Sequence, residues 1–118
     1  MANQLASFCP RYHHAVELVG RRWTGAVIRV LLQGRARYHE LRGAIPDISD
    51  RMLSERLREL ESEGVIARAV IPETPVRVEY ELTDKGRALE PVVRAISKWA
   101  ERWVELPEGE LKAAGSRD

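Results

Sequence analysis

Apolar residues recur at helical spacing in several short segments of the chain, and Gly and Pro separate these segments. Residues 11–19 and residues 24–34 each carry an apolar face, and a third, shorter helix is expected at 38–44. Thr24 is placed to cap the second helix, because its hydroxyl can accept a hydrogen bond from a first-turn amide. The first third of the chain is therefore predicted to be helical.

The clearest helical pattern lies between residues 50 and 63. Leu53, Leu57 and Leu60 form one narrow apolar stripe, and the other positions of this segment are mostly charged or small and polar. Ser49 precedes the segment as a predicted N-cap. A short helix at 38–44, a four-residue turn and this capped helix have the arrangement of a helix-turn-helix over about 38–63.

After Gly64 the apolar period changes from about 3.6 residues to 2. Residues 76–82 alternate apolar and charged side chains, and residues 65–71 are rich in β-branched side chains. The segment 72–75 contains two prolines and joins the two predicted strands. A lone hairpin is marginally stable, so we expect this wing (about 65–82) to pack on the helices with its tip projecting.

A last helix is expected over 84–104, bent at Pro91. Its long apolar face includes two tryptophans and lies beyond the compact helix and hairpin unit, which predicts a subunit interface together with helix 11–19. Trp23, beside the apolar stripe of the second helix, is interpreted as a core residue. The residues expected at the interface are Tyr12, Val16, Leu89, Val92, Val93, Ile96, Trp99 and Trp103.

Length and composition agree with one small folded unit. The 118 residues are 44% hydrophobic and 31% charged, which favours a single α+β domain over 1–118, mainly helical, and excludes a multidomain enzyme. No run approaches a membrane-spanning length, and the start of the chain lacks the pattern of a secretory signal. With one cysteine and no possible intrachain disulfide, we expect a cytoplasmic protein that does not bind membranes.

The net charge of +1 hides an uneven distribution. Residues 1–45 sum to +5, whereas 46–71 and 72–118 each sum to −2. A localised basic excess suits double-stranded DNA as a partner better than the total suggests. The acidic remainder is expected to be surface that does not contact DNA.

Candidate DNA contacts fall into three groups. The predicted recognition helix offers small polar and charged side chains near its start, where base edges and phosphates are reached. The wing offers an arginine suited to a minor groove, and the basic first part offers phosphate contacts. The alternatives are a solvated helix face with Arg–Glu pairs, a wing arginine paired with Glu79, and structural salt bridges. The candidates are Ser49, Arg51, Ser54, Glu55 and Arg58, then Thr74 and Arg77, then Arg22, Thr24 and Arg37.

Cys9, with His13 and His14, is the one constellation that raises chemistry other than binding. Pro10 is expected to begin a helix, so Cys9 lies at a helix N-terminus beside Arg11, a setting that favours a reactive thiolate. Cys9 is therefore a candidate sensor of oxidants or electrophiles, and an inert structural cysteine is the alternative. We expect no catalytic residue, metal site or cofactor, since a third orienting group and further ligands are lacking.

Four stretches carry a family likeness, namely Cys9-Pro10, GRRWTGAVIRVLLQG (20–34), RYHELRGAIPDISDRMLSERLRELESEGVI (37–66) and PVRVEYELTDKGRAL (75–89). Over roughly residues 9–104 the chain resembles the HxlR-type winged helix-turn-helix transcriptional regulators. This resemblance implies a homodimer on an inverted-repeat operator, acting as a repressor or an activator. It also implies terminal helices that form the dimer and, in some members, a cysteine at the Cys9 position that responds to oxidants or electrophiles.

Two positions depart from the pattern of that family. Arg21 and Arg22 stand where Gly-Lys is common, which keeps a cation, and Asp50 follows the Ser49 cap where proline or an uncharged residue is frequent. The carboxylate of Asp50 puts a negative charge near DNA. The alternative function from another class is a winged-helix module that binds a protein partner through the same polar face.

Overall fold

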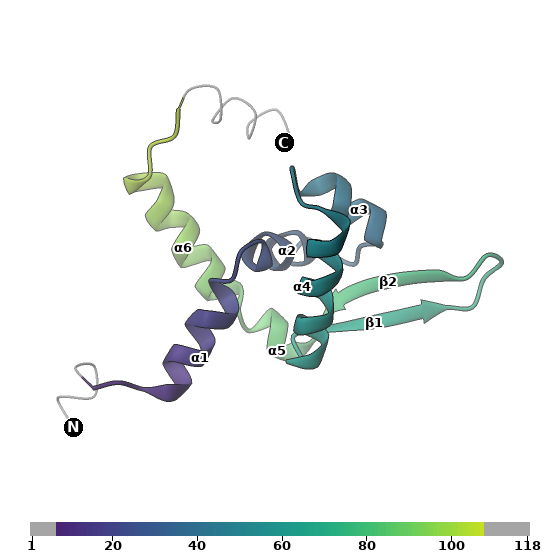
Figure 1. Cartoon of the computed structure of the whole chain (residues 1–118), viewed down its shortest axis with the longest axis horizontal. Coiled ribbons are helices and arrows are strands. Elements are labelled where there is room, and N and C mark those ends of the chain that lie inside the picture. Colours follow the sequence, from purple (N-terminus) through teal and green to yellow (C-terminus); the bar gives the residue numbers. More distant parts are fainter. Residues whose placement is uncertain (1–6, 108–118) are drawn as a thin grey trace.

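The computed structural model describes residues 7–107 and has its helices gathered around the base of a single β-hairpin, whose far end extends well beyond them (Figure 1). The α+β class predicted from the sequence, mainly helical with a two-stranded wing, is confirmed. In chain order the elements are α1 (Pro10–Val19), α2 (Thr24–Leu31), α3 (Tyr38–Ala44), α4 (Asp50–Ser62), β1 (Ile66–Ile71), β2 (Arg77–Leu82), α5 (Asp84–Arg87) and α6 (Glu90–Trp103).

One apolar cluster holds α2, α3, α4 and the base of the hairpin together. The predicted leucine stripe of α4 is confirmed, because Leu53, Leu57 and Leu60 are all buried. The Ser49 cap is confirmed too, since its Oγ accepts a hydrogen bond from the amide of Met52 at 3.0 Å. The rest of the cluster is Val27, Ile28, Leu31, Ala36, Leu41, Ile45, Ile48, Val65, Ile66 and Leu82.

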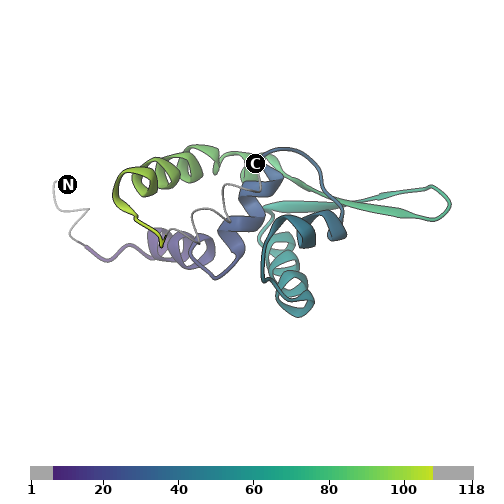
Figure 2. The same ribbon diagram turned by 90° about the horizontal axis from the view of Figure 1, so that it is seen from above.

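The two strands pair antiparallel, from Ile66 opposite Leu82 at the base to Ile71 opposite Arg77 near the tip. Ala36, in the segment between α2 and α3, exchanges backbone hydrogen bonds of 3.0 and 2.8 Å with Tyr80. This bridge fixes the hairpin against the helices. Beyond it the ribbon passes beside the start of α3, and its tip at residues 72–76 is exposed and extends past the helices (Figures 1 and 2).

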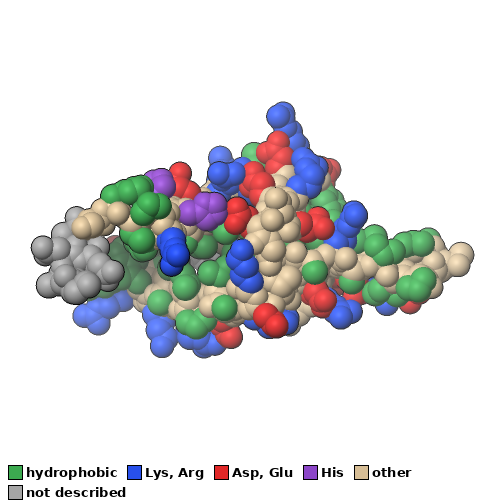
Figure 3. Space-filling model, turned by 90° about the horizontal axis from the view of Figure 1, so that it is seen from below, with side chains coloured by type: hydrophobic (Ala, Val, Ile, Leu, Met, Phe, Trp, Pro, Cys, Tyr) green, Lys and Arg blue, Asp and Glu red, His purple; other side chains and the backbone are tan. Residues whose placement is uncertain are grey.

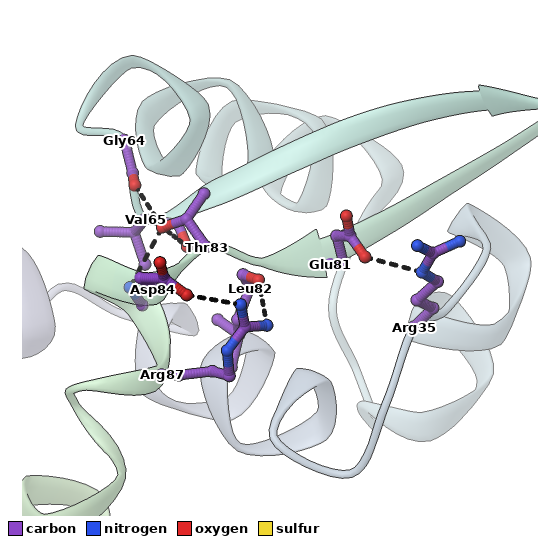
Figure 4. Close-up of polar contacts among 9 residues, drawn as sticks. Arg35, Gly64, Val65, Glu81, Leu82, Thr83, Asp84 and Arg87 are labelled. Carbon is purple, nitrogen blue, oxygen red and sulfur yellow. Dashed lines mark hydrogen bonds and ion pairs between the residues drawn. The ribbon is translucent and has the colours of Figure 1, made fainter.

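The base of the hairpin is tied to the turns on either side of it (Figure 4). Thr83 donates from its hydroxyl to the carbonyl of Gly64 at 2.6 Å and from its amide to the carbonyl of Val65 at 3.0 Å. Gly86 of α5 packs so closely here that a Cβ atom would lie 2.2 Å from the Val65 carbonyl oxygen. This close approach requires glycine.

The predicted helix over 84–104 is wrong as a single bent element. The chain forms α5, a break at 88–89, and then α6. Pro91 lies in the first turn of α6, where the missing N–H removes no helical hydrogen bond, so it starts a new helix and bends none. Thr83 is the N-cap of α5, and its hydroxyl accepts from the amide of Gly86.

The second helix also differs from prediction. Its N-cap is Trp23, in the left-handed region at φ 75°, and Thr24 is the first helical residue with 1% of its surface exposed. The tight turn before it, closed by a 3.0 Å bond from the Thr24 amide to the Arg21 carbonyl, directs the Thr24 side chain inward. Thr24 is thus a core residue and caps nothing. The helix ends at Leu31, earlier than the expected 34.

None of the helices within residues 7–107 combines the length and the apolar character that crossing a lipid bilayer requires.

Candidate nucleic-acid interface

The outer face of α4 is the most prominent polar surface on the helix-turn-helix. The helix projects from the body of the molecule, and cationic and acidic side chains are mixed over this projection (Figure 3). Arg51 has 87% of its side chain exposed, Arg58 is exposed, and Ser54 and Glu55 are half-buried. The Nε of Arg51 lies 3.5 Å from a Glu55 carboxylate oxygen. An Arg–Glu pair of the kind expected for a merely solvated helix face is therefore present.

The start of α4 is held by α3. The Nε of Arg42 donates to Asp50 Oδ1 at 2.9 Å, and the Tyr38 hydroxyl lies 3.1 Å from the same oxygen and 3.0 Å from the Asp50 carbonyl. The hydrogen bond from Arg42 lowers the pKa of the Asp50 carboxyl below its ordinary value, and the Tyr38 bond adds to this effect. Asp50 is therefore ionised and partnered at neutral pH.

The inner face of α4 contains a buried cation that was not among the residues predicted from the sequence. Arg56 is 9% exposed, and its guanidinium donates to the Arg22 carbonyl at 2.9 Å and to Glu59 Oε1 at 2.7 Å. The other oxygen of Glu59 accepts from Arg21 at 2.9 Å. The sequence did contain an indication that Arg56 is buried, because this residue follows Leu53 by three residues and so lies on the same side of the helix as the buried leucine stripe.

This network connects α4 to the turn between α1 and α2. Burial raises the pKa of the Glu59 carboxyl, but hydrogen bonds and positive charge from Arg56 and Arg21 outweigh burial and lower it. His14 of α1 adds a further contact, with its Nε2 3.1 Å from Glu63. Polar contacts thus connect α4 to the α1–α2 turn, and Glu63, the residue that follows α4, to α1.

The basic candidates from the first part of the chain have different environments. Arg22 is exposed, with its guanidinium carbon 5.1 Å from the centre of the Trp23 ring. Arg37 is half-buried at the start of α3, where its backbone amide donates to the Glu40 carboxylate at 2.7 Å. Thr24, a predicted phosphate contact, is enclosed in the core and offers no side-chain surface to a ligand in this conformation.

The wing brings together residues that are far apart in the sequence. A hollow of about 420 Å³ lies between the start of α3 and the wing tip, and its lining includes Arg37, Thr74 and Arg77. Arg77 is paired within the hairpin, at 3.3 Å from both Glu73 and Glu79. Pairing with Glu79 is the alternative considered for it, and 31% of its side chain remains exposed.

A second surface, the apolar groove, lies between α1, α2 and α6 and has a volume of about 730 Å³. Every residue of α6 is at least partly exposed, and Trp99 and Trp103 are each more than 60% exposed. Figure 3 shows hydrophobic side chains gathered at this end of the molecule. Among the predicted interface residues, Tyr12, Val16, Val92 and Ile96 are exposed, whereas Leu89 and Val93 are partly buried against the core.

Cys9 is exposed and stands as the N-cap of α1, with Pro10 as the first helical residue, as predicted. Its carbonyl accepts from the His13 amide at 2.9 Å. His13 packs its ring against Phe8, and His14 contacts Glu63 just after α4, so the two histidines have partners other than the Cys9 thiol. Over residues 7–107, no three His, Cys, Asp or Glu side chains are grouped to hold a metal ion.

Comparison with known proteins identifies the family. The model of the HxlR-like helix-turn-helix family matches residues 18–108, which is more than half of the chain. The chain belongs to the HxlR-like helix-turn-helix family. The matched region spans the elements from the end of α1 to beyond α6 and includes α3, α4 and the wing.

Relatives in this HxlR-like family are named as transcriptional regulators. The regulator YvaP of Bacillus subtilis is 52% identical over 100 residues, covering 85% of this chain and 93% of YvaP. YodB of the same organism is 46% identical over 99 residues, covering 84% of this chain and 88% of YodB. The HxlR-like chain is thus similar to helix-turn-helix transcriptional regulators over most of its length.

Solved structures support the same assignment. The reduced form of YodB superposes with a TM-score of 0.76 at 45% identity, covering 84% of this chain and 97% of YodB. The oxidised form of the redox regulator HypR gives 0.77 at 37% identity, covering 83% of this chain and all of that chain. YodB is also known in diamide-treated and quinone-bound forms.

Proposed function

We propose that this HxlR-like protein is a homodimeric regulator that binds an inverted-repeat operator in double-stranded DNA, with α4 in the major groove and the wing beside it. The observation that carries this is the projecting polar face of α4, capped at Ser49 and held by α3, next to a wing hollow that collects Arg37 and Arg77. A helix held at its start and exposed along its outer face is suited to reading base edges.

The proposed contacts follow from exposure. Arg58 is exposed and Arg51, beside Glu55, is 87% exposed, so both can reach guanine or phosphate, and Ser54 is small enough for close approach. Arg22, Arg37, Thr74 and Arg77 are assigned to the DNA backbone or the minor groove. Glu55 lies beside Arg51 on α4, and Ser49 precedes the helix as its N-cap. Thr24 is left out of the proposed contacts because it is buried.

Salt dependence of binding tests this function. Affinity for duplex DNA containing the operator should fall on the order of a thousandfold between 50 and 200 mM salt if about six phosphates are contacted. Arg51→Ala should reduce discrimination between operator and random duplex, and Arg77→Ala should weaken both to a similar degree. Absence of DNA binding at low salt would contradict the proposal and favour a module that binds a protein partner.

The dimer is proposed from the apolar groove and the exposed face of α6. Two half-sites require two recognition helices, and a 118-residue chain supplies one. The exposed aromatic and aliphatic side chains of α1 and α6 have the composition of an interface core. A monomer at micromolar concentration in sedimentation equilibrium would contradict this assembly.

Cys9 is proposed as the sensor of an oxidant or electrophile, because its thiol is exposed at the start of α1 and because YodB is known in diamide-treated and quinone-bound forms. A quinone would add to the sulfur, with transfer of the thiol proton. Diamide would take two electrons and two protons from two thiols to form a disulfide, and the second thiol must come from another molecule, since Cys9 is the sole cysteine.

The test compares the wild type with Cys9→Ser. Diamide or a quinone should weaken operator binding of the wild type and leave Cys9→Ser unaffected, with intact mass measuring the modification. Equal responses of the two proteins would remove Cys9 from the mechanism. We propose that the protein acts in the cytoplasm by binding alone, without catalysis or a cofactor.

A further inference from the structure

Asp50 is the first residue of α4, at the end of the helix that the proposed function inserts into the major groove. Its side chain is 74% exposed. With α4 in the groove, this carboxylate would be close to the phosphates of DNA, which repel it. Asp50 is not needed to cap the helix, because the uncharged Ser49 already accepts a hydrogen bond from a first-turn amide.

Two residues of α3 hold this carboxylate in one orientation. Tyr38 and Arg42 are four residues apart on one face of α3, and both reach Asp50 Oδ1, at 3.1 and 2.9 Å. The Tyr38 hydroxyl also lies 3.0 Å from the Asp50 carbonyl oxygen and 3.4 Å from Ser54 Oγ. The side chain is therefore fixed at one oxygen and has a positive charge beside it.

This cluster of Tyr38, Arg42 and Asp50 has unused hydrogen-bonding capacity. Within residues 7–107, Asp50 Oδ2 accepts no hydrogen bond, and neither Nη1 nor Nη2 of Arg42 donates one. The cluster presents an acceptor from Asp50 next to donors from Arg42. The Arg42 side chain is 43% exposed and is free to face a phosphate while its Nε keeps the carboxylate.

The chemistry of the major groove limits what this acceptor can read. An ionised carboxylate only accepts hydrogen bonds, and the exocyclic amino groups of cytosine and adenine are the donors on base edges there. Adenine carries the N7 acceptor beside its amino group, and that lone pair repels a carboxylate. Cytosine is the base whose edge fits Asp50 without such repulsion.

We infer that Asp50 is a specificity-determining residue of α4 that accepts a hydrogen bond from the amino group of a cytosine, with Tyr38 and Arg42 as its positioning residues. This inference rests on the proposed function, since it requires α4 in the major groove. It also assigns a role to the acidic residue that departs from the sequence pattern of the family: Arg42 offsets the charge, and the oriented carboxylate contributes sequence information.

Selection from a randomised DNA duplex library tests the inference on the full chain. The wild type should enrich a motif with cytosine at one position of each half-site. Asp50→Asn should change the preference at that position toward adenine by about tenfold, because an amide carries both the donor for N7 and the acceptor for the adenine amino group. The other positions of the motif should stay the same.

Asp84→Asn is the matched control. Asp84 is likewise the first residue of a helix, α5, is exposed, and accepts from an arginine at 2.9 Å, so the variant makes the same chemical change away from α4. Its motif should equal that of the wild type. Tyr38→Phe should lower the cytosine preference severalfold while leaving the salt dependence of affinity unchanged, since no phosphate contact is removed.

The outcomes are separable. An identical motif for the wild type and Asp50→Asn, or a loss spread evenly over all positions of the motif, would show that Asp50 only joins α3 to α4 and would overturn the inference. A wild type that enriches no sequence would overturn the proposed function and this inference with it. Thermal unfolding of each variant establishes that the selected protein is folded.

Discussion

The helices α4 and α6 are alike in length and amphipathic pattern, and their apolar faces have opposite environments. Leu53, Leu57 and Leu60 of α4 are at most 2% exposed, whereas Ile96 and Trp99 of α6 are 55% and 62% exposed. The apolar face of α4 packs against α2, α3 and the hairpin of its own chain. A periodic apolar stripe therefore predicts a buried helix face without saying which molecule buries it.

The largest effect should come from the face that the chain buries itself. Leu53→Ala should lower the free energy of unfolding by about 3 kcal/mol, through lost apolar burial and the cavity that remains. Urea unfolding measures it. Ile96→Ala, measured below the concentration at which dimers form, should cost less than about 1 kcal/mol, since its side chain is already exposed. Similar losses of unfolding free energy for Leu53→Ala and Ile96→Ala would contradict the difference in burial between α4 and α6.

Substitutions on α6 are expected to have a smaller effect, on the dissociation constant of the dimer. Trp99→Ala should raise the dimer dissociation constant about thirtyfold, or about 2 kcal/mol, since large aromatic side chains supply much of the binding energy of interfaces. Sedimentation equilibrium measures it. The adjacent residue Lys98, also exposed, provides the control Lys98→Ala, which should leave the constant unchanged. An unchanged constant for Trp99→Ala would place the interface elsewhere.

The smallest effect concerns the polar contacts of α4. Glu59→Gln should lower stability at neutral pH by less than about 1 kcal/mol, because Glu59 is half-buried and solvent screens its pairs. Its folded pKa lies below the ordinary 4.5, so the contribution is present above that pH and is lost as the pH falls through the folded pKa.

Unfolding midpoints measured from pH 7 down to about pH 3 should therefore converge for wild type and Glu59→Gln. A difference between the two midpoints that grows toward acid pH would contradict a lowered pKa of Glu59 in the folded state. Glu61→Gln, on the same helix, is the control, and its effect at neutral pH should be smaller than that of Glu59→Gln.

The parts of the fold that the sequence predicted well depend on local chemistry. The Ser49 cap, the α4 stripe and the strand-forming residues of 76–82 act over a few residues, and the helix-turn-helix and the paired strands followed from them. The alternating burial expected along 76–82 is not seen, because Val76 is exposed and residues 77–81 are all half-buried. The break before α6 was missed because an apolar stripe continues across it from Leu89 to Val92 and Val93.

The conformation at Trp23 and Thr24 and the burial of Arg56 were not predicted, because they depend on tertiary contacts. Trp23 takes a left-handed conformation, and Thr24 turns inward with it. The guanidinium of Arg56 is paired within α4 by Glu59, three residues on, and its other partner is the carbonyl of Arg22, thirty-four residues away. No short-range pattern contains this second partner. For the candidate site, the residue types at the start of α4 were visible in the sequence, but the arrangement of Arg42 and Tyr38 around Asp50 required the packing of α3 on α4.

The hairpin has a consequence for how members of such a fold can diverge. Its base is fixed by Thr83 and by the Ala36–Tyr80 bridge, while residues 72–76 at the tip are exposed. Residues added to or removed from the tip would change the reach of the ribbon without disturbing the apolar cluster. The length of the wing is therefore a quantity that selection can adjust almost independently of the stability of the domain.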